Sequence, residues 1–127
     1  MNIPSDLLYT KDHEWVKIDG DTATVGITDF AQGELGDVVF VQLPETGSQA
    51  KQGDAFGTIE AVKAVADLYA PVSGEIVDTN QTLEENPEAI NNSPYEDGWI
   101  IRIKVNNLDA DKSTLLDAAA YTELTSA

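Results

Sequence analysis

The clearest alternation of hydrophobic and polar residues runs from Gly98 to Val105 and predicts a β-strand. Two stretches rich in β-branched residues, 14–18 and 22–27, flank an Asp-Gly pair at 19–20, which predicts a β-hairpin. A continuous apolar run at 37–43 ends at Pro44 and predicts a further strand. Two more strands are expected at 55–62 and 72–80.

Three segments predict short helices. Residues 28–36 place Thr28 at the N-cap and Gly36 at the end of a helix. Residues 82–90 predict one or two helical turns interrupted by a proline, and residues 109–120 predict a C-terminal helix. Many short strands with few helices are typical of a mainly-β sandwich or barrel. No low-complexity linker divides the chain, so we expect one domain over 1–127.

The stretch GTIEAVKAVADLYAP, residues 57–71, contains a single lysine, Lys63, among alanine and valine. Residues 60–68 include good helix formers, and no Gly, Asn or Pro marks a turn at the lysine. Local propensity therefore slightly favours a helix, whereas the β-rich remainder of the chain favours two strands. The residues alone leave both structures open.

The amino-acid composition of the chain restricts the kinds of partner that it can bind. The 127 residues include 23 acidic and 7 basic side chains, a formal net charge of −16. Such a surface lacks the Lys/Arg clusters that bind nucleic acid or anionic lipid, and favours partners with basic docking surfaces. The first nine residues do not resemble a signal peptide, and no apolar run approaches the roughly 20 residues that span a bilayer. We expect a soluble, cytoplasmic protein.

The sequence offers little for catalysis. Cysteine is absent, which excludes disulfides, zinc-thiolate sites and thiol nucleophiles. There is no Gly-x-Ser-x-Gly elbow, no phosphate-binding loop and no dinucleotide motif. His13, the only histidine, is interpreted as a structural or surface residue beside Trp15. A hydrolase using acidic residues is an alternative without a specific motif, and we expect neither an enzyme nor a metal site.

Six motifs are informative together: DHEWV (12–16), VGIT (25–28), LGDVVFV (35–41), GTIEAVKA (57–64), APVSGE (70–75) and NSPYEDGW (92–99). In this order they resemble the H-protein family of the glycine cleavage system over nearly the whole chain. A lipoyl domain of a 2-oxoacid dehydrogenase would carry Asp-Lys-Ala at its modified lysine, and a biotinyl domain Met-Lys-Met. This chain has Val-Lys-Ala at 62–64, as H proteins do.

The resemblance implies a flattened β-barrel, or barrel-sandwich hybrid, like that of lipoyl domains, with short helices and a C-terminal helix at about 109–120. Lys63 would lie at the tip of a hairpin at about 55–72 and carry lipoic acid as an amide on its ε-amine. The small neighbours of the lysine would leave it accessible to the attaching enzyme. Glu60 and Gly74 match positions that lipoylating enzymes read in related domains.

The resemblance also implies a carrier rather than an enzyme. A pyridoxal-phosphate decarboxylase, the P protein, would load an aminomethyl group onto the lipoyl arm, and the T protein, an aminomethyltransferase, would remove it. The L protein, dihydrolipoyl dehydrogenase, would reoxidise the arm with NAD. We expect a monomer that meets these partners and a lipoyl-attaching enzyme. A protein that relays its lipoyl group to other complexes would need the same lysine and hairpin, so that alternative stays open.

Three carboxylates stand at family positions suited to holding the loaded arm. The aminomethyl cargo carries an ammonium, which carboxylates bind through charge-assisted hydrogen bonds. Glu14 and Asp67 are the main candidates, and Asp12 is expected to assist. Docking there would also limit the access of water to the cargo.

Overall fold

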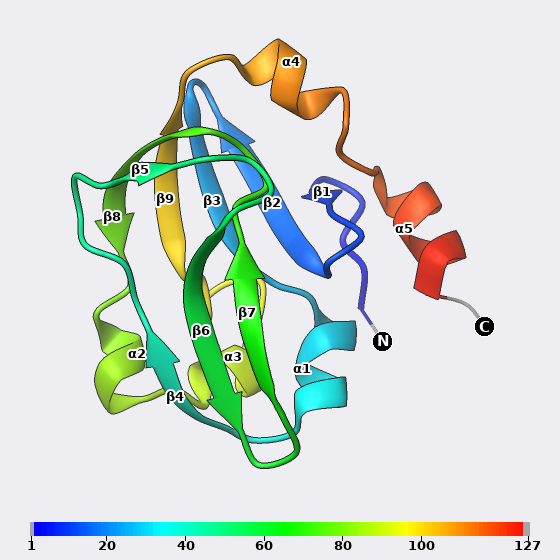
Figure 1. The fold of residues 1–127 in the computed structure, drawn as a ribbon. Helices are drawn as coiled ribbons and strands as arrows, with labels where there is room; N and C mark the ends of the chain where they lie inside the picture. Colours follow the sequence, from blue (N-terminus) through cyan, green and yellow to red (C-terminus); the bar gives the residue numbers. More distant parts are fainter. Residues whose placement is uncertain (1, 126–127) are drawn as a thin grey trace.

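The computed structural model describes residues 2–125 as two antiparallel sheets that face one another (Figure 1). One sheet has the strand order β1-β2-β3-β9-β8-β5 and the other β4-β6-β7. The expected mainly-β, barrel-sandwich architecture is confirmed, as two sheets that do not close into one barrel. The strands are β1 (Leu8–Tyr9), β2 (Glu14–Asp19), β3 (Thr22–Ile27), β4 (Val38–Gln42), β5 (Gln49–Ala50), β6 (Ala55–Ala61), β7 (Val65–Tyr69), β8 (Gly74–Thr79) and β9 (Ile101–Val105).

The strands predicted from local patterns are confirmed: the strand at 22–27 has the predicted bounds, β2 is one residue longer, and the others are shorter by one to three residues. The first hairpin pairs Glu14 with Ile27 and Asp19 with Thr22 around Gly20, whose φ of 65° suits the tight turn. The stretch 57–71 forms β6 and β7, not a helix. Pairing with β4 and burial of Ile59 of β6 and Leu68 of β7 outweigh its weak helical preference.

The main core lies between the sheets. Val25 and Ile103 of the larger sheet and Ile59 of the smaller one have no exposed surface, and Leu68 is 2% exposed. Each such side chain contributes roughly 1.5–3 kcal/mol on burial. The hydrophobic effect therefore holds the two sheets together.

The helices are short and lie around the edges of the sheets (Figure 1). Thr28 accepts a hydrogen bond from Ala31 N at the start of α1, and Gly36 ends it, as predicted. The helical turns expected around Pro87 are also confirmed. Among the described residues, no helix is long and apolar enough to cross a membrane. The helices are α1 (Asp29–Leu35), α2 (Thr82–Glu85), α3 (Ala89–Asn92), α4 (Leu108–Lys112) and α5 (Ala118–Thr125).

The expected C-terminal helix is present as α5, but the prediction of one continuous helix over 109–120 is wrong. The structure has α4 and α5, separated by residues 113–117. In that interval Leu116 forms a β-bridge to Tyr9, with both N···O distances at 2.7 Å. Asp117 then accepts a hydrogen bond from Ala120 N and starts the second helix. A contact with β1, distant in sequence, therefore interrupts a locally favourable helix.

A second apolar cluster joins α5 to the opposite face of β1 and β2. Tyr121 of α5 stacks on Tyr9 with ring centroids 4.7 Å apart, and Trp15 and Leu7 complete the cluster. Trp15 Nε1 donates to the Pro94 carbonyl oxygen at 2.8 Å. Trp15 and the next residue, Val16, point to opposite faces of β2. The strand therefore contributes Val16 to the main core and Trp15 to the second cluster.

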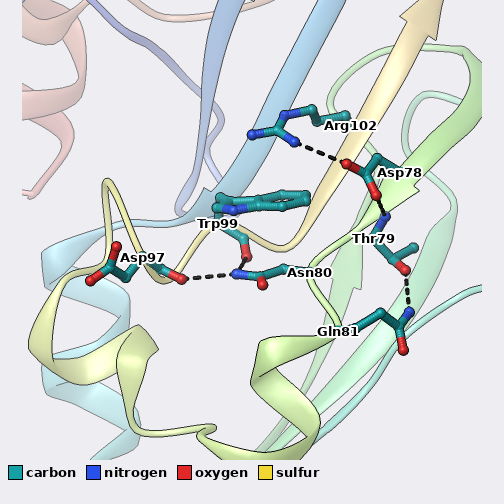
Figure 2. A network of polar contacts seen from close by, with 7 residues as sticks. All are labelled: Asp78, Thr79, Asn80, Gln81, Asp97, Trp99 and Arg102. Carbon is teal, nitrogen blue, oxygen red and sulfur yellow. Dashed lines mark hydrogen bonds and ion pairs between the residues drawn. The ribbon is translucent and has the colours of Figure 1, made fainter.

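Polar contacts fix the loop that precedes β9 (Figure 2). Asn80 is buried, and its amide donates to the Asp97 and Trp99 carbonyl oxygens at 2.8 Å each. Arg102 lies over the Trp99 ring, 3.9 Å from its centroid, and pairs with Asp78 at 3.0 Å. The two bonds of the buried Asn80 hold the loop, whereas the partly exposed ion pair contributes little.

The close packing of β8 against β9 leads to a testable expectation. A Cβ added at Gly74 would lie 1.9 Å from the Lys104 carbonyl oxygen, which is backbone and cannot rotate away. Gly74→Ala should lower the free energy of unfolding by at least about 2 kcal/mol in urea denaturation. Gly33→Ala, in α1 with nothing near the new methyl, is the control and should stabilise by about 0.5–1 kcal/mol. Equal effects of the two variants would contradict this packing.

Candidate functional site

Lys63 lies at the tip of the β6–β7 hairpin. Ala61 N donates to the Ala64 carbonyl oxygen at 2.9 Å and closes a turn whose central residues are Val62 and Lys63. All three residues from 62 to 64 are exposed. The expected position of the lysine, at an exposed hairpin tip with small neighbours, agrees with this geometry.

Backbone hydrogen bonds tie the tip to the end of α1. Val62 N donates to the Asp37 carbonyl oxygen at 3.0 Å, and Lys63 N donates to that of Leu35 at 3.2 Å. The two acceptors lie on either side of Gly36, the residue that caps the C-terminal end of α1. The hairpin and the helix therefore hold each other in place. The lysine is therefore presented from a fixed backbone rather than from a free loop.

Gly36 makes this contact sterically feasible. Its φ of 78° is a conformation that favours glycine, and an added Cβ would lie 3.1 Å from Val62 Cγ2 and 3.2 Å from Lys63 Cγ. The aliphatic part of the lysine thus passes over this glycine. Asn91 of α3 braces the segment, donating to the Gly36 carbonyl oxygen at 2.9 Å and accepting from Val38 N at 2.8 Å.

A cavity of about 400 Å³ lies beside the hairpin, between α1, β6–β7 and the residues that lead into β2. Leu35, whose carbonyl receives the Lys63 N–H, is part of its wall. The cavity therefore adjoins the lysine. Most of its wall is apolar and is formed by Ile27, Phe30, Ala31, Leu35, Ile59 and Leu68.

Carboxylates form the polar part of the wall. Asp12, Glu14 and Asp67, the three predicted from the family resemblance, all line this cavity. They come from the β2 region and from β7, which only the fold brings together. Glu34 of α1 is a fourth carboxylate on the wall that the sequence did not reveal. Of the four, Glu14 alone is buried.

Glu14 is 2% exposed and is the only charged side chain that is buried among residues 2–125. One carboxylate oxygen accepts from Thr10 Oγ1 at 2.7 Å and the other from Tyr69 N at 3.2 Å. Burial raises the pKa of this carboxyl to about 7 because it disfavours the charged form, and the two hydrogen bonds oppose the rise. Both donors are neutral, so a cation that enters the cavity would be stabilised here.

His13 forms another part of the wall and was not predicted to do so. Its ring packs on Phe30 with centroids 4.7 Å apart, and Nδ1 lies 2.8 Å from the Tyr121 hydroxyl oxygen. Burial lowers the pKa of the imidazole and so favours its neutral form. Of the two predicted alternatives, a structural or a surface residue, these contacts favour the structural one. The position of His13 on the cavity depends on α1 and α5, which its sequence neighbours do not specify.

The two residues expected to guide lipoylation lie in different places. Glu60 is exposed on β6, three residues before Lys63 and beside the tip. Gly74 is buried at the start of β8, which belongs to the other sheet and follows the end of β7 away from the tip. Packing against Lys104 already requires glycine at position 74. A role for either residue in lipoylation stays a prediction.

An exposed lysine at a two-strand tip, on a small domain of two facing sheets, is the arrangement expected of carrier domains that bear a prosthetic group on a hairpin lysine. The comparisons with known proteins agree with that class and narrow it. A family model described as "Glycine cleavage H-protein" matches residues 7–127.

Relatives support the same family. The glycine cleavage system H protein of Rubrobacter xylanophilus is 62% identical over 104 residues, 82% of each chain. That of Staphylococcus carnosus is 51% identical over 124 residues, 98% of each chain. A crystal structure of the glycine cleavage system H protein from Mycobacterium marinum superposes with a TM-score of 0.84 at 41% identity, covering 95% of this chain and 97% of that one. The chain belongs to the glycine cleavage H-protein family, whose members are lipoyl carriers of the glycine cleavage system.

The burial of Glu14 has a consequence for stability. The pKa of Glu14 is about 7 in the folded protein, against an ordinary value of 4.5. As the pH rises through this range, the carboxyl ionises more readily in the unfolded chain, which favours unfolding. The free energy of unfolding of Glu14→Gln, minus that of the wild type, should therefore rise by about 2 kcal/mol between pH 5 and pH 8. Urea denaturation at both pH values measures this. Glu34→Gln controls for loss of one negative charge on the same cavity, and a pH-independent difference for Glu14→Gln would contradict the raised pKa.

Proposed function

We propose that Lys63 carries the lipoyl group as an amide on Nζ and that the chain carries the aminomethyl group from the P protein to the T protein. The L protein then restores the disulfide form with NAD. When bound, the lipoyl group supplies the sulfur that holds the cargo and a dithiol–disulfide couple. The observation that carries this proposal is the exposed Lys63, tied to α1 beside a cavity lined with carboxylates.

The residues present fit such a group. Lys63 is exposed, and Ala61 and Ala64 leave room around it. The apolar wall of the adjoining cavity suits an aliphatic chain, and its volume of about 400 Å³ suits a small organic group. The carboxylates on the same wall suit a cation at the end of that chain. Amide formation would remove the lysine charge, which favours contact with an apolar wall.

The chain's own residues would hold and shield the cargo. Glu14 and Asp67 would accept hydrogen bonds from its ammonium, with Asp12 assisting from the exposed rim. A bound cation favours the ionised form of Glu14 and so lowers its pKa from about 7. The apolar wall would keep water from the remaining sides of the cargo.

We infer that the chain does not itself catalyse the bond-making steps. The cavity offers carboxylates and one histidine, and Nδ1 of that histidine already contacts Tyr121. Within residues 2–125, no group of three or more His, Asp or Glu side chains is arranged to hold a metal ion. The proposed role is that of a cytoplasmic, monomeric carrier domain spanning 1–127, with P, T and L proteins and a lipoyl-attaching enzyme as partners.

The assignment of Lys63 can be tested by reconstitution. Lipoylated protein with P protein and glycine should support exchange of carbon dioxide with the glycine carboxyl group, and Lys63→Arg should abolish it because arginine offers no amine for the amide. Lys104→Arg, an exposed lysine on β9, is the matched control and should remain active. Lipoylated wild type without exchange activity would favour the relay alternative. A hydrolytic activity that survives in Lys63→Arg would favour the hydrolase.

The role of the cavity can be tested by the lifetime of the cargo. Glu14→Gln combined with Asp67→Asn should speed the decay of the loaded carrier about tenfold, because charge-assisted hydrogen bonds to the ammonium are lost. Release of formaldehyde after removal of free glycine measures the decay. The control combines Glu75→Gln with Asp54→Asn, two exposed carboxylates outside this cavity. An unchanged decay rate in the first double variant would exclude the proposed docking.

A further inference from the structure

Exposed hydrophobic side chains gather around Lys63. Among residues 2–125, six large hydrophobic side chains are exposed, and four of them lie on β4 or at the hairpin tip. The other two, Val77 and Leu124, are on β8 and α5. We call the four the tip patch: Val39, Phe40, Val62 and Val65, with exposed fractions of 57%, 51%, 65% and 65%.

A β-bulge creates half of this patch. Val38 of β4 is opposite Ala61 and Phe40 is opposite Glu60, so Val39 is an extra residue in the ladder. Val38 is 3% exposed and points to the core, whereas Val39 and Phe40 are both exposed. Regular alternation would place two consecutive residues on opposite faces. The bulge instead places both side chains outward, next to the last residues of β6.

The strand register then joins the two halves of the patch. Phe40 of β4 pairs with Glu60 of β6, and Glu60 pairs with Val65 of β7. Directly paired residues share a face, so the three side chains form one row across the outer face of the small sheet. Val62 follows Glu60 at the tip. The result is an apolar surface with one exposed carboxylate inside it, immediately beside Lys63.

This surface is best explained by a partner that acts on Lys63. Apolar patches on a protein surface mark interaction sites, and this one occurs in a chain with a net charge of −16. A partner that acts at the far end of a long prosthetic arm does not need to cover the hairpin. An enzyme that forms a bond to Nζ must cover the surface next to it. The position of the patch therefore favours the enzyme that acylates the lysine.

We propose that the tip patch and Glu60 form the docking surface for the lipoyl-attaching enzyme, an inference that rests on the proposed function. That enzyme transfers the lipoyl acyl group from an activated acyl donor to Nζ. The amide C–N bond forms, the bond between the acyl carbon and its leaving group breaks, the leaving group keeps the electron pair, and Nζ loses a proton. The complementary surface of the enzyme is apolar, with a lysine or arginine that pairs with Glu60.

The test uses unmodified full-length protein, a purified lipoyl-attaching enzyme and its activated donor, with intact mass as the readout. Phe40→Ser should raise KM for the carrier about tenfold with little change in kcat, as expected for one buried contact of an interface. Val65→Thr, which keeps the side-chain shape and adds a hydroxyl, should raise KM several-fold. Leu124→Ser and Val77→Thr are the matched exposed controls, and their KM should stay within about twofold of the wild type.

Two further measurements show whether the tip patch serves the lipoyl-attaching enzyme or another partner. Glu60→Gln should raise KM most at low ionic strength, since salt screens a pair of exposed charges. Phe40→Ser protein that has been lipoylated to completion should support carbon dioxide exchange like the wild type. Unchanged KM in the patch variants, or equal increases in the controls, would overturn the proposal. Normal acylation with impaired exchange would also overturn it and assign the patch to a shuttle partner. A wild-type chain that is never acylated at Lys63 would overturn the proposed function itself.

Discussion

The buried carboxyl group of Glu14 is the feature on which the stability of the fold and the chemistry of the cavity both depend. It lies on the inward face of β2 with Val16, and Tyr69 N of the facing sheet donates to it at 3.2 Å. Burial raises its pKa to about 7, so at neutral pH its partial ionisation weakens the fold. A structure that only had to be stable would place an apolar side chain here. The position suits a protein that binds a cation at this point.

The second constraint is the contact between the hairpin tip and α1. The carbonyl oxygens of Leu35 and Asp37 accept the Lys63 and Val62 amide hydrogens, and Gly36 leaves space for the tip. The same helix forms part of the cavity wall. One short helix therefore both fixes where the lysine is presented and forms part of the wall of the adjoining cavity. The position of the lysine relative to the cavity therefore follows from backbone hydrogen bonds between the hairpin tip and α1.

Features with local causes were predictable from the sequence. The Asp-Gly hairpin, the strand β9 and the caps of α1 follow from turn chemistry and side-chain pattern, although β9 begins at Ile101 and not at the predicted Gly98. The burial of Glu14 could have been inferred from its spacing to Val16 and Ile18. Features with distant causes were not predictable in this way. The bridge between Leu116 and Tyr9 splits the C-terminal helix, and the bulge at Val39 turns Phe40 outward from an apolar run. The hairpin itself came from family resemblance, against local propensity.

The proposed carrier function depends most on an electrostatic interaction between Glu14 and the cargo on Lys63. The ¹³C shift of the Glu14 carboxyl, followed against pH in lipoylated protein with and without the aminomethyl cargo, measures that link directly. We expect a midpoint near 7 without cargo and a clearly lower one with cargo, because a docked ammonium favours the ionised carboxylate. The same midpoint in both states would mean that the cargo is held elsewhere and would contradict the account.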